Sequence, residues 1–175
     1  MKISKSFIIY IHILLASIFS TNISYSSLPN NLTILKESIS INKLIFKDVN
    51  LKDVDLTKNK GNIMIINFWA TWCAPCRKEM ASLDEFSKNY PEILVFPINM
   101  EKPNVKKVKK FYKNIDLKEL KIFFAPDFKL AKTLKLRGLP TSFVIDKKGK
   151  IVARIIGEID FNDIKFTKFI EEFNL

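Results

Sequence analysis

The chain has 175 residues, of which 47% are hydrophobic, which is enough for one globular domain with a sizeable core. Its 29 Lys and Arg residues outnumber its 18 Asp and Glu residues and give a formal charge of +11, but the lysines are spread along the whole chain. Nucleic-acid-binding surfaces gather their basic residues into a patch, so we interpret these lysines as solvated faces and expect no nucleic-acid partner, with a basic binding surface as the alternative.

The N-terminus has the pattern of an export signal over residues 1–26. Two lysines precede an apolar run over residues 7–19, and Ser24 and Ser26 are the small residues of a weak cleavage site. A helix of that length is roughly 20 Å long, shorter than the roughly 30 Å hydrocarbon core, which favours cleavage over a permanent anchor. We therefore expect an exported, periplasmic protein. The alternative is a protein anchored to the inner membrane by residues 7–19, and we expect no other part of the chain to contact the membrane.

Residues 27–38 are predicted to be a linker, because they are rich in Ser, Asn and Leu with little periodicity, and a domain is predicted over 39–175. Hydrophobic periodicity within the domain predicts alternating strands and helices. The predicted strands cover 44–49, 62–69, 93–99, 122–125, 141–146 and 151–156. The predicted helices cover 76–89, 105–115, 129–136 and 163–173. With a hairpin turn over 146–150, this order predicts an α/β fold, a mixed central β-sheet flanked by helices.

The chain has two cysteines, Cys73 and Cys76, three residues apart between a buried strand and a helix. The first turn of a helix leaves N–H groups unpaired and carries partial positive charge, which favours a thiolate over a thiol. We expect Cys73 to be the exposed, acidic thiol, since the pKa of such cysteines falls to roughly 3.5–7.5. Cys76 lies one turn further along nearly the same helix face, where it can form a disulfide with Cys73.

A pair of cysteines at this spacing has other interpretations: half of a zinc site, a structural disulfide, or two unrelated core thiols. Structural zinc needs four Cys or His ligands. The chain adds only His12, within the apolar run, so we expect no metal and no cofactor. The strand before the pair, Trp72 and the helix after it favour a redox-active pair.

Two stretches resemble a known family, the exported thioredoxin-like proteins of the TlpA, ResA and DsbE group. The active-site block of that group is similar to residues 67–80, NFWATWCAPCRKEM, and its second signature is similar to residues 138–146, GLPTSFVID. The resemblance extends over about 39–173. It implies a thioredoxin fold and thiol–disulfide exchange, with Cys73 as nucleophile and Cys76 as resolving thiol.

The resemblance also implies a substrate-binding edge at Pro140. Without an N–H group and with a fixed φ, Pro140 holds the backbone of Leu139 open for an extended substrate chain. Sequence alone favours a trans bond, since roughly 5–6% of X–Pro bonds are cis, but the resemblance implies a cis bond facing the disulfide. We expect Trp72, Leu139 and Pro140 to bind the substrate together. We also expect Trp69 and Trp72 to line the site. The alternative for Trp69 is a position in the hydrophobic core.

Glu79 is the expected proton acceptor. Ordinary thioredoxin has a buried acidic residue six places before the first cysteine, where this chain has Asn67, which cannot titrate. Another group must therefore handle the proton of Cys76. Glu79 lies three residues beyond Cys76, and the exported group carries a functional glutamate at the matching position. The alternative is a surface glutamate paired with a lysine.

The function implied by the resemblance is reduction of disulfides in periplasmic proteins, as in cytochrome c maturation, with apocytochrome c a candidate substrate and a membrane-embedded thiol carrier as electron donor. Ala74 and Pro75 provide no positive group to over-stabilise a Cys73 thiolate, which favours a reductant over an oxidase or isomerase. A thiol peroxidase is a further alternative. Its Pro-x-x-x-Thr/Ser-x-x-Cys pattern is missing, since Ile66 and Ala70 occupy its first two positions.

Overall fold

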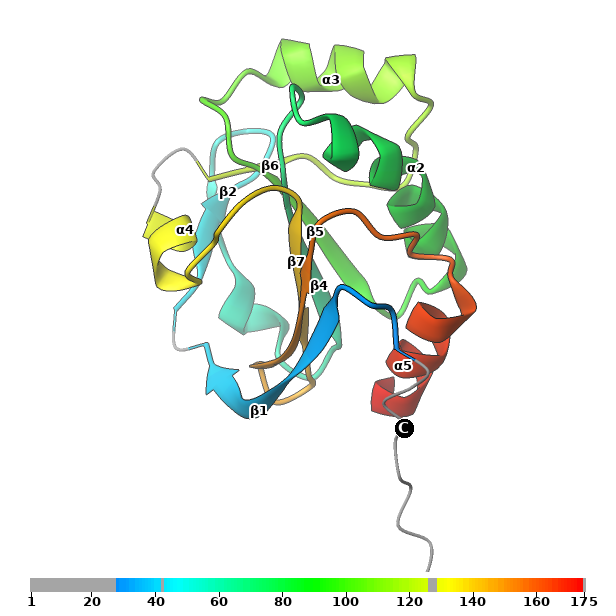
Figure 1. The fold of residues 1–175 in the computed structure, drawn as a ribbon. Helices are drawn as coiled ribbons and strands as arrows, with labels where there is room; N and C mark the ends of the chain where they lie inside the picture. The colour runs from blue at the N-terminus through cyan, green and yellow to red at the C-terminus, as the bar shows by residue number, and fades with distance from the viewer. Residues whose placement is uncertain (1–27, 42, 126–128, 175) are drawn as a thin grey trace, which may run out of the picture.

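The computed structural model describes residues 28–41, 43–125 and 129–174 (Figure 1). Over this part of the chain, eight strands form one sheet in the order β1-β8-β7-β4-β5-β6-β2-β3. The strands are β1 (Leu32–Ser40), β2 (Ile45–Lys47), β3 (Asp53–Asp55), β4 (Met64–Trp69), β5 (Leu94–Asn99), β6 (Phe123–Phe124), β7 (Thr141–Ile145) and β8 (Lys150–Ile156). The helices are the 3₁₀ helix η2 (Leu56–Asn59), α2 (Ala74–Asn89), α3 (Val105–Asn114), α4 (Lys129–Thr133) and α5 (Ile164–Asn174).

The predicted export signal over 1–26 lies outside the described residues. Among the residues that are described, no helix is both long enough and apolar enough to cross a membrane.

Strand β4 lies at the centre of the sheet and carries the candidate site at its end. It pairs parallel with β5 and antiparallel with β7, and all of its residues are buried. Successive side chains of a strand point to opposite faces, so Ile65 and Trp69 enter one core while Met64, Ile66 and Phe68 enter the other. Residues of α2, α3 and α5 cover the first face, and residues of α4 and η2 cover the second. The predicted mixed sheet flanked by helices is confirmed.

The predicted hairpin before β8 is also confirmed. The Asp146 N–H donates to the Lys150 carbonyl at 2.9 Å, and the Gly149 N–H donates to the Asp146 carbonyl at 2.9 Å. Gly149 has a φ of +77°, in the left-handed region that glycine adopts without a steric penalty. Each of the other predicted strands and helices also forms, with ends shifted by a few residues.

The predicted linker over 27–38 is wrong for its second half, because Leu32–Ser40 forms β1 and pairs antiparallel with β8. Leu32 lies opposite Ile155 and is the one residue of the strand that is buried. The pairing register shifts between Ile34 and Ile39. An edge strand with an irregularity and one exposed face has little of the regular alternation that sequence analysis depends on.

Candidate active site

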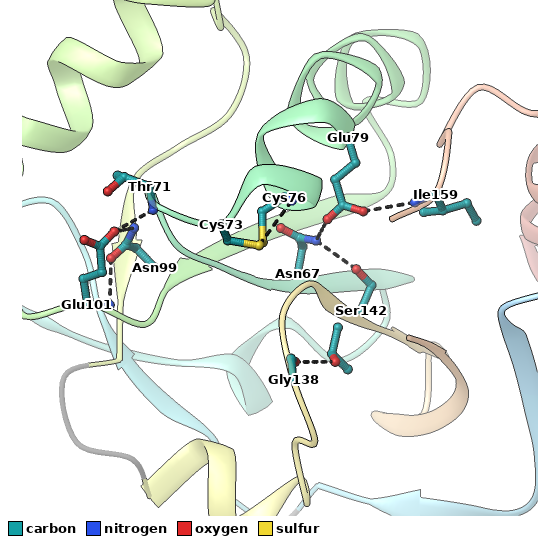
Figure 2. Close-up of a disulfide and its surroundings, with 11 residues drawn as sticks. Asn67, Thr71, Cys73, Cys76, Glu79, Asn99, Glu101, Gly138, Ser142 and Ile159 are labelled. Atoms are coloured by element: carbon teal, nitrogen blue, oxygen red, sulfur yellow. Dashed lines mark hydrogen bonds between the residues drawn. A yellow bond between two sulfur atoms is a disulfide. The ribbon is translucent and has the colours of Figure 1, made fainter. Parts of the chain in front are cut away.

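The site lies where β4 ends and α2 begins, and its centre is a disulfide between Cys73 and Cys76 (Figure 2). The two sulfurs are 2.04 Å apart and the two Cα atoms 5.3 Å apart. The predicted pairing is therefore confirmed, and the interpretation as two unrelated core thiols is wrong. Within the described ranges, no group of three or more His, Cys, Asp and Glu side chains is placed to hold a metal ion.

Cys73 is the N-cap of α2, and its side chain accepts a hydrogen bond from the Cys76 N–H at 3.3 Å. Pro75 lies in the first turn, where its missing N–H leaves no gap in the helix. A thiolate at Cys73 keeps this donor and gains the favourable end of the helix dipole. The local structure therefore stabilises negative charge on Cys73 rather than on Cys76.

The expected exposure of Cys73 is wrong. Its exposed fraction is 4%, against 0% for Cys76, so Cys73 is the more accessible of the two by a small margin. The reason is tertiary packing, because the disulfide joins the hydrophobic cluster that contains Trp69, Ala70 and Met80.

The two tryptophans lie in different environments. Trp69 is fully buried, and its ring lies 5.2 Å from that of Phe111 and 5.9 Å from that of Tyr112, so it belongs to the core rather than to a wall of the site. Trp72 is 70% exposed and stands beside Cys73 in the chain. A large aromatic side chain in that position offers apolar surface to a partner.

The Leu139–Pro140 peptide bond is cis, which confirms the conformation that the resemblance implies. Pro140 is buried, and its carbonyl accepts a hydrogen bond from the Gly157 N–H at 2.9 Å. Leu139 is half-buried and packs against the cluster that contains both cysteines. Leu139 thus lies in the turn before β7, outside the strand pairing that begins at Thr141.

Glu79 is buried, with an exposed fraction of 3%, so the alternative of a surface glutamate is wrong. Its Oε1 accepts a hydrogen bond from Asn67 Nδ2 at 2.7 Å, and its Oε2 accepts one from the Ile159 N–H at 3.1 Å (Figure 2). Burial raises the pKa of Glu79 from 4.5 to about 7, and these two hydrogen bonds oppose the rise. A carboxyl group that titrates near neutral pH thus lies one helical turn beyond Cys76.

Sequence analysis missed Ser142 and Glu101, two polar residues that hold the site together. Ser142 lies directly opposite Asn67 in the β4–β7 pairing, and its Oγ accepts a second hydrogen bond from Asn67 Nδ2 at 2.9 Å. The sequence signal that could have identified Ser142 was a polar residue near the start of a predicted buried strand.

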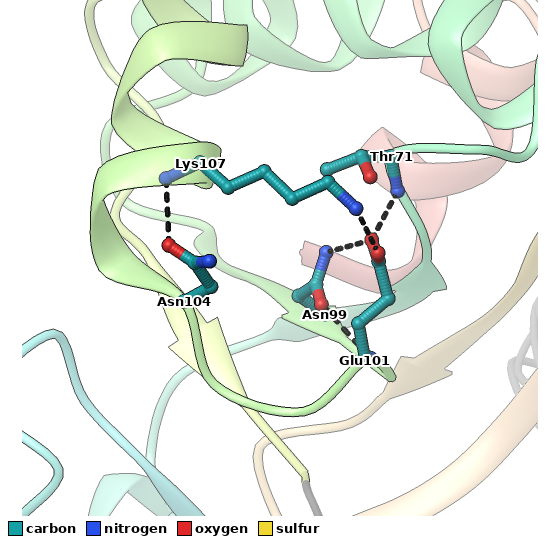
Figure 3. Close-up of polar contacts among 5 residues, drawn as sticks. All are labelled: Thr71, Asn99, Glu101, Asn104 and Lys107. Carbon is teal, nitrogen blue, oxygen red and sulfur yellow. Dashed lines mark hydrogen bonds and ion pairs between the residues drawn. The ribbon is translucent and has the colours of Figure 1, made fainter.

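Glu101 braces the loop between β4 and α2 (Figure 3). One carboxylate oxygen accepts hydrogen bonds from the Thr71 N–H at 2.6 Å and from Asn99 Nδ2 at 3.3 Å, and the other forms an ion pair with Lys107 of α3. Burial opposes ionisation, but the hydrogen bonds from Lys107, Thr71 and Asn99 outweigh it and lower the pKa of Glu101 to about 2. The loop that carries Trp72 is thus tied to the end of β5.

Comparisons with known proteins agree with this geometry. Residues 38–154 match the AhpC/TSA family. The thiol-disulfide oxidoreductase ResA of one Bacillus cereus strain is 36% identical over 129 residues, which are 70% of this chain and 73% of that protein. Among solved structures, the exposed lipoprotein thioredoxin Etrx1 of Streptococcus pneumoniae is 27% identical with a TM-score of 0.63, covering 74% of this chain and 98% of that one. StoA of Bacillus subtilis is 26% identical with a TM-score of 0.59, covering 76% and 96%. The predicted thioredoxin fold is confirmed.

Proposed function

Because the chain belongs to the AhpC/TSA family and to the ResA-like thiol-disulfide oxidoreductases of the TlpA, ResA and DsbE group, we propose that it reduces disulfides in exported proteins through Cys73 and Cys76. The observation that carries this proposal is the disulfide at the start of α2, with Cys73 as the N-cap and Glu79 buried beyond Cys76. The cap favours a thiolate at the first sulfur, and the carboxylate provides a base for the second.

The reaction begins with the reduced pair. The Cys73 thiolate attacks one sulfur of the substrate disulfide, and the other substrate sulfur leaves as a thiolate that takes a proton from solvent. Cys76 then gives its proton to the Glu79 carboxylate and attacks the Cys73 sulfur. The mixed disulfide breaks, the second substrate sulfur leaves and takes up a proton, and the Cys73–Cys76 disulfide closes. One substrate disulfide has gained two electrons and two protons.

Substrate recognition is assigned to Trp72, Leu139 and Pro140. An extended substrate segment pairs with the backbone before β7, while Trp72, next to Cys73 in the chain, provides an exposed apolar surface. Among disulfide-bearing exported proteins, apocytochrome c is the candidate that the family resemblance suggests, since its haem-attachment motif holds a Cys-X-X-Cys pair.

The proposed location is the periplasm, reached through the export signal at 1–26, which is cleaved or retained as an anchor through residues 7–19. A structural disulfide persists in such an oxidising compartment, whereas a reducing pair there needs a supply of electrons. A membrane-embedded thiol carrier is the proposed donor: its dithiol closes to a disulfide as the Cys73–Cys76 pair opens.

Trapping of mixed disulfides tests this function. Cys76→Ser keeps the nucleophile and removes the resolving thiol, so we expect it to accumulate mixed disulfides with partners through Cys73, measured after acid quench by non-reducing gel electrophoresis and mass spectrometry. Cys73→Ser is the matched control and should trap little. Equal trapping by the two variants would contradict the assignment of Cys73 as nucleophile.

A further inference from the structure

The side-chain amide of Asn67 is fully buried and has one satisfied end and one unsatisfied end. Its Nδ2 donates to Glu79 Oε1 at 2.7 Å and to Ser142 Oγ at 2.9 Å. Its Oδ1 is buried and has no hydrogen-bond partner in the described part of the chain. Buried carbonyl oxygens in native proteins are nearly always paired, so an orphaned one beside a reactive centre needs an explanation.

The orphaned oxygen points toward the disulfide. Cys76 and Glu79 are three residues apart on α2 and are therefore neighbours on one helix face. The nitrogen end of the Asn67 amide is bonded to Glu79 on this helix and to Ser142 on β7, which leaves its oxygen end free of both. Figure 2 shows the amide between the disulfide and Glu79, with its oxygen on the side of the sulfurs.

A disulfide sulfur has no hydrogen to donate, whereas a thiol has one. Reduction by two glutathione thiols gives each of the two cysteine sulfurs one electron and one proton and leaves one glutathione disulfide. Reduction thus creates a donor among the sulfurs, on the side where Asn67 Oδ1 is left without a partner in the described part of the oxidised protein.

We infer that Asn67 is a redox-sensing positioning residue whose Oδ1 accepts a hydrogen bond from the Cys76 thiol in the reduced protein. This inference deepens the proposed function and rests on it, since the pair must open. One amide then holds the proton on Cys76 through its oxygen and favours the Glu79 carboxylate through its nitrogen. The amide thus lies between the Cys76 thiol and the base that receives its proton, and the reduced form gains a hydrogen bond that the oxidised form lacks.

The redox equilibrium gives the first test. Asn67→Leu removes both ends of the amide at similar volume, and Ser142→Ala is the matched control, because it removes one partner of Nδ2 and leaves Oδ1 in place. In glutathione buffers at a single pH, we expect Asn67→Leu to lower the equilibrium constant for reduction about fivefold, which is about 20 mV. Ser142→Ala should change it less than about twofold. An equal change in both variants, or no change in Asn67→Leu, would overturn the inference.

A vibrational measurement gives a second test that does not depend on how Asn67→Leu folds. Cys73→Ala leaves Cys76 as the one thiol and removes the competing sulfur. We expect its infrared S–H stretching band to lie at lower frequency than that of a simple alkyl thiol in an apolar solvent, because the hydrogen is bonded to Asn67. A band at the free-thiol frequency would refute the role of Asn67 even if Cys76→Ser traps partners normally. A lowered band without any trapping would refute the disulfide-reducing function alone.

Discussion

Replacing Glu79 by Gln removes the buried carboxylate one helical turn beyond Cys76. Burial raises the pKa of Glu79 from 4.5 to about 7. At about 1.4 kcal/mol for each pKa unit, this shift corresponds to about 3 kcal/mol of folding free energy. The folded chain holds the Glu79 proton more tightly than the unfolded chain does. The resulting contribution to folding stability is therefore fully present below about pH 4.5 and is lost as the pH rises through about 7.

The assay is denaturant unfolding between about pH 4.5 and about pH 8.5. It uses the oxidised protein, because disulfide-bonded cysteines do not titrate. Wild type should lose about 3 kcal/mol relative to Glu79→Gln over this range, because Gln does not titrate. Glu85→Gln is the control, since Glu85 is an exposed residue of the same helix whose loss should leave the wild-type pH dependence intact.

The same variant tests the proton transfer. For wild type we expect the rate of substrate disulfide reduction to rise through an inflection near pH 7, where Glu79 becomes a base, and for Glu79→Gln we expect that inflection to disappear. Parallel stability curves and parallel rate profiles in the two chains would refute the argument, because they would mean that Glu79 titrates in the fold as an ordinary surface glutamate does.

Two other predictions concern the surroundings of the disulfide. Because the pKa of Glu101 is lowered, its contribution to folding stability is present above about pH 4.5 and is lost as the pH falls toward 2. Glu101→Gln should therefore lower the unfolding free energy by about 2 kcal/mol at neutral pH and by progressively less in acid. This figure is reduced from the full pKa shift because the partner Lys107 is half-exposed to solvent. A loss of stability that is independent of pH would contradict the stabilising role of the Glu101 carboxylate. Ile66 and Ala70 are fully buried apolar side chains where a thiol peroxidase has Pro and Thr or Ser. The reduced protein should consume hydrogen peroxide in stopped flow no faster than a model thiol of similar pKa, and much faster consumption would favour the peroxidase alternative.

The parts of the fold that could be predicted from sequence are those with strong local patterns. The buried strand β4 and the helix α2 are long and regular, and they locate Cys73 and Cys76 without any tertiary information. β1 could not be predicted in the same way, because Leu32 is its one buried residue and the pairing register shifts within it. An edge strand of this kind is defined by its partner β8 rather than by its own sequence.

The environment of the site residues could not be predicted from local sequence, because distant segments create it. The Glu79 carboxylate is covered by the backbone of Ile159, 80 residues away. The loop before α2 is held by Glu101, 30 residues beyond Thr71. The expected exposure of Cys73 was wrong for the same reason. Chemical roles follow from residue type and spacing, whereas burial and pKa depend on what the chain packs around them.

The reduction potential of the Cys73–Cys76 pair tests the central claim most directly. Strong oxidants gain their power from a stabilised thiolate, and Ala74 and Pro75 add no positive group beside Cys73. Equilibration of the protein with a series of glutathione buffers should therefore give a potential nearer to the reducing value of roughly −270 mV than to the oxidising value of roughly −120 mV. A potential above about −160 mV would make the protein an oxidase or isomerase and contradict the proposed reduction of disulfides.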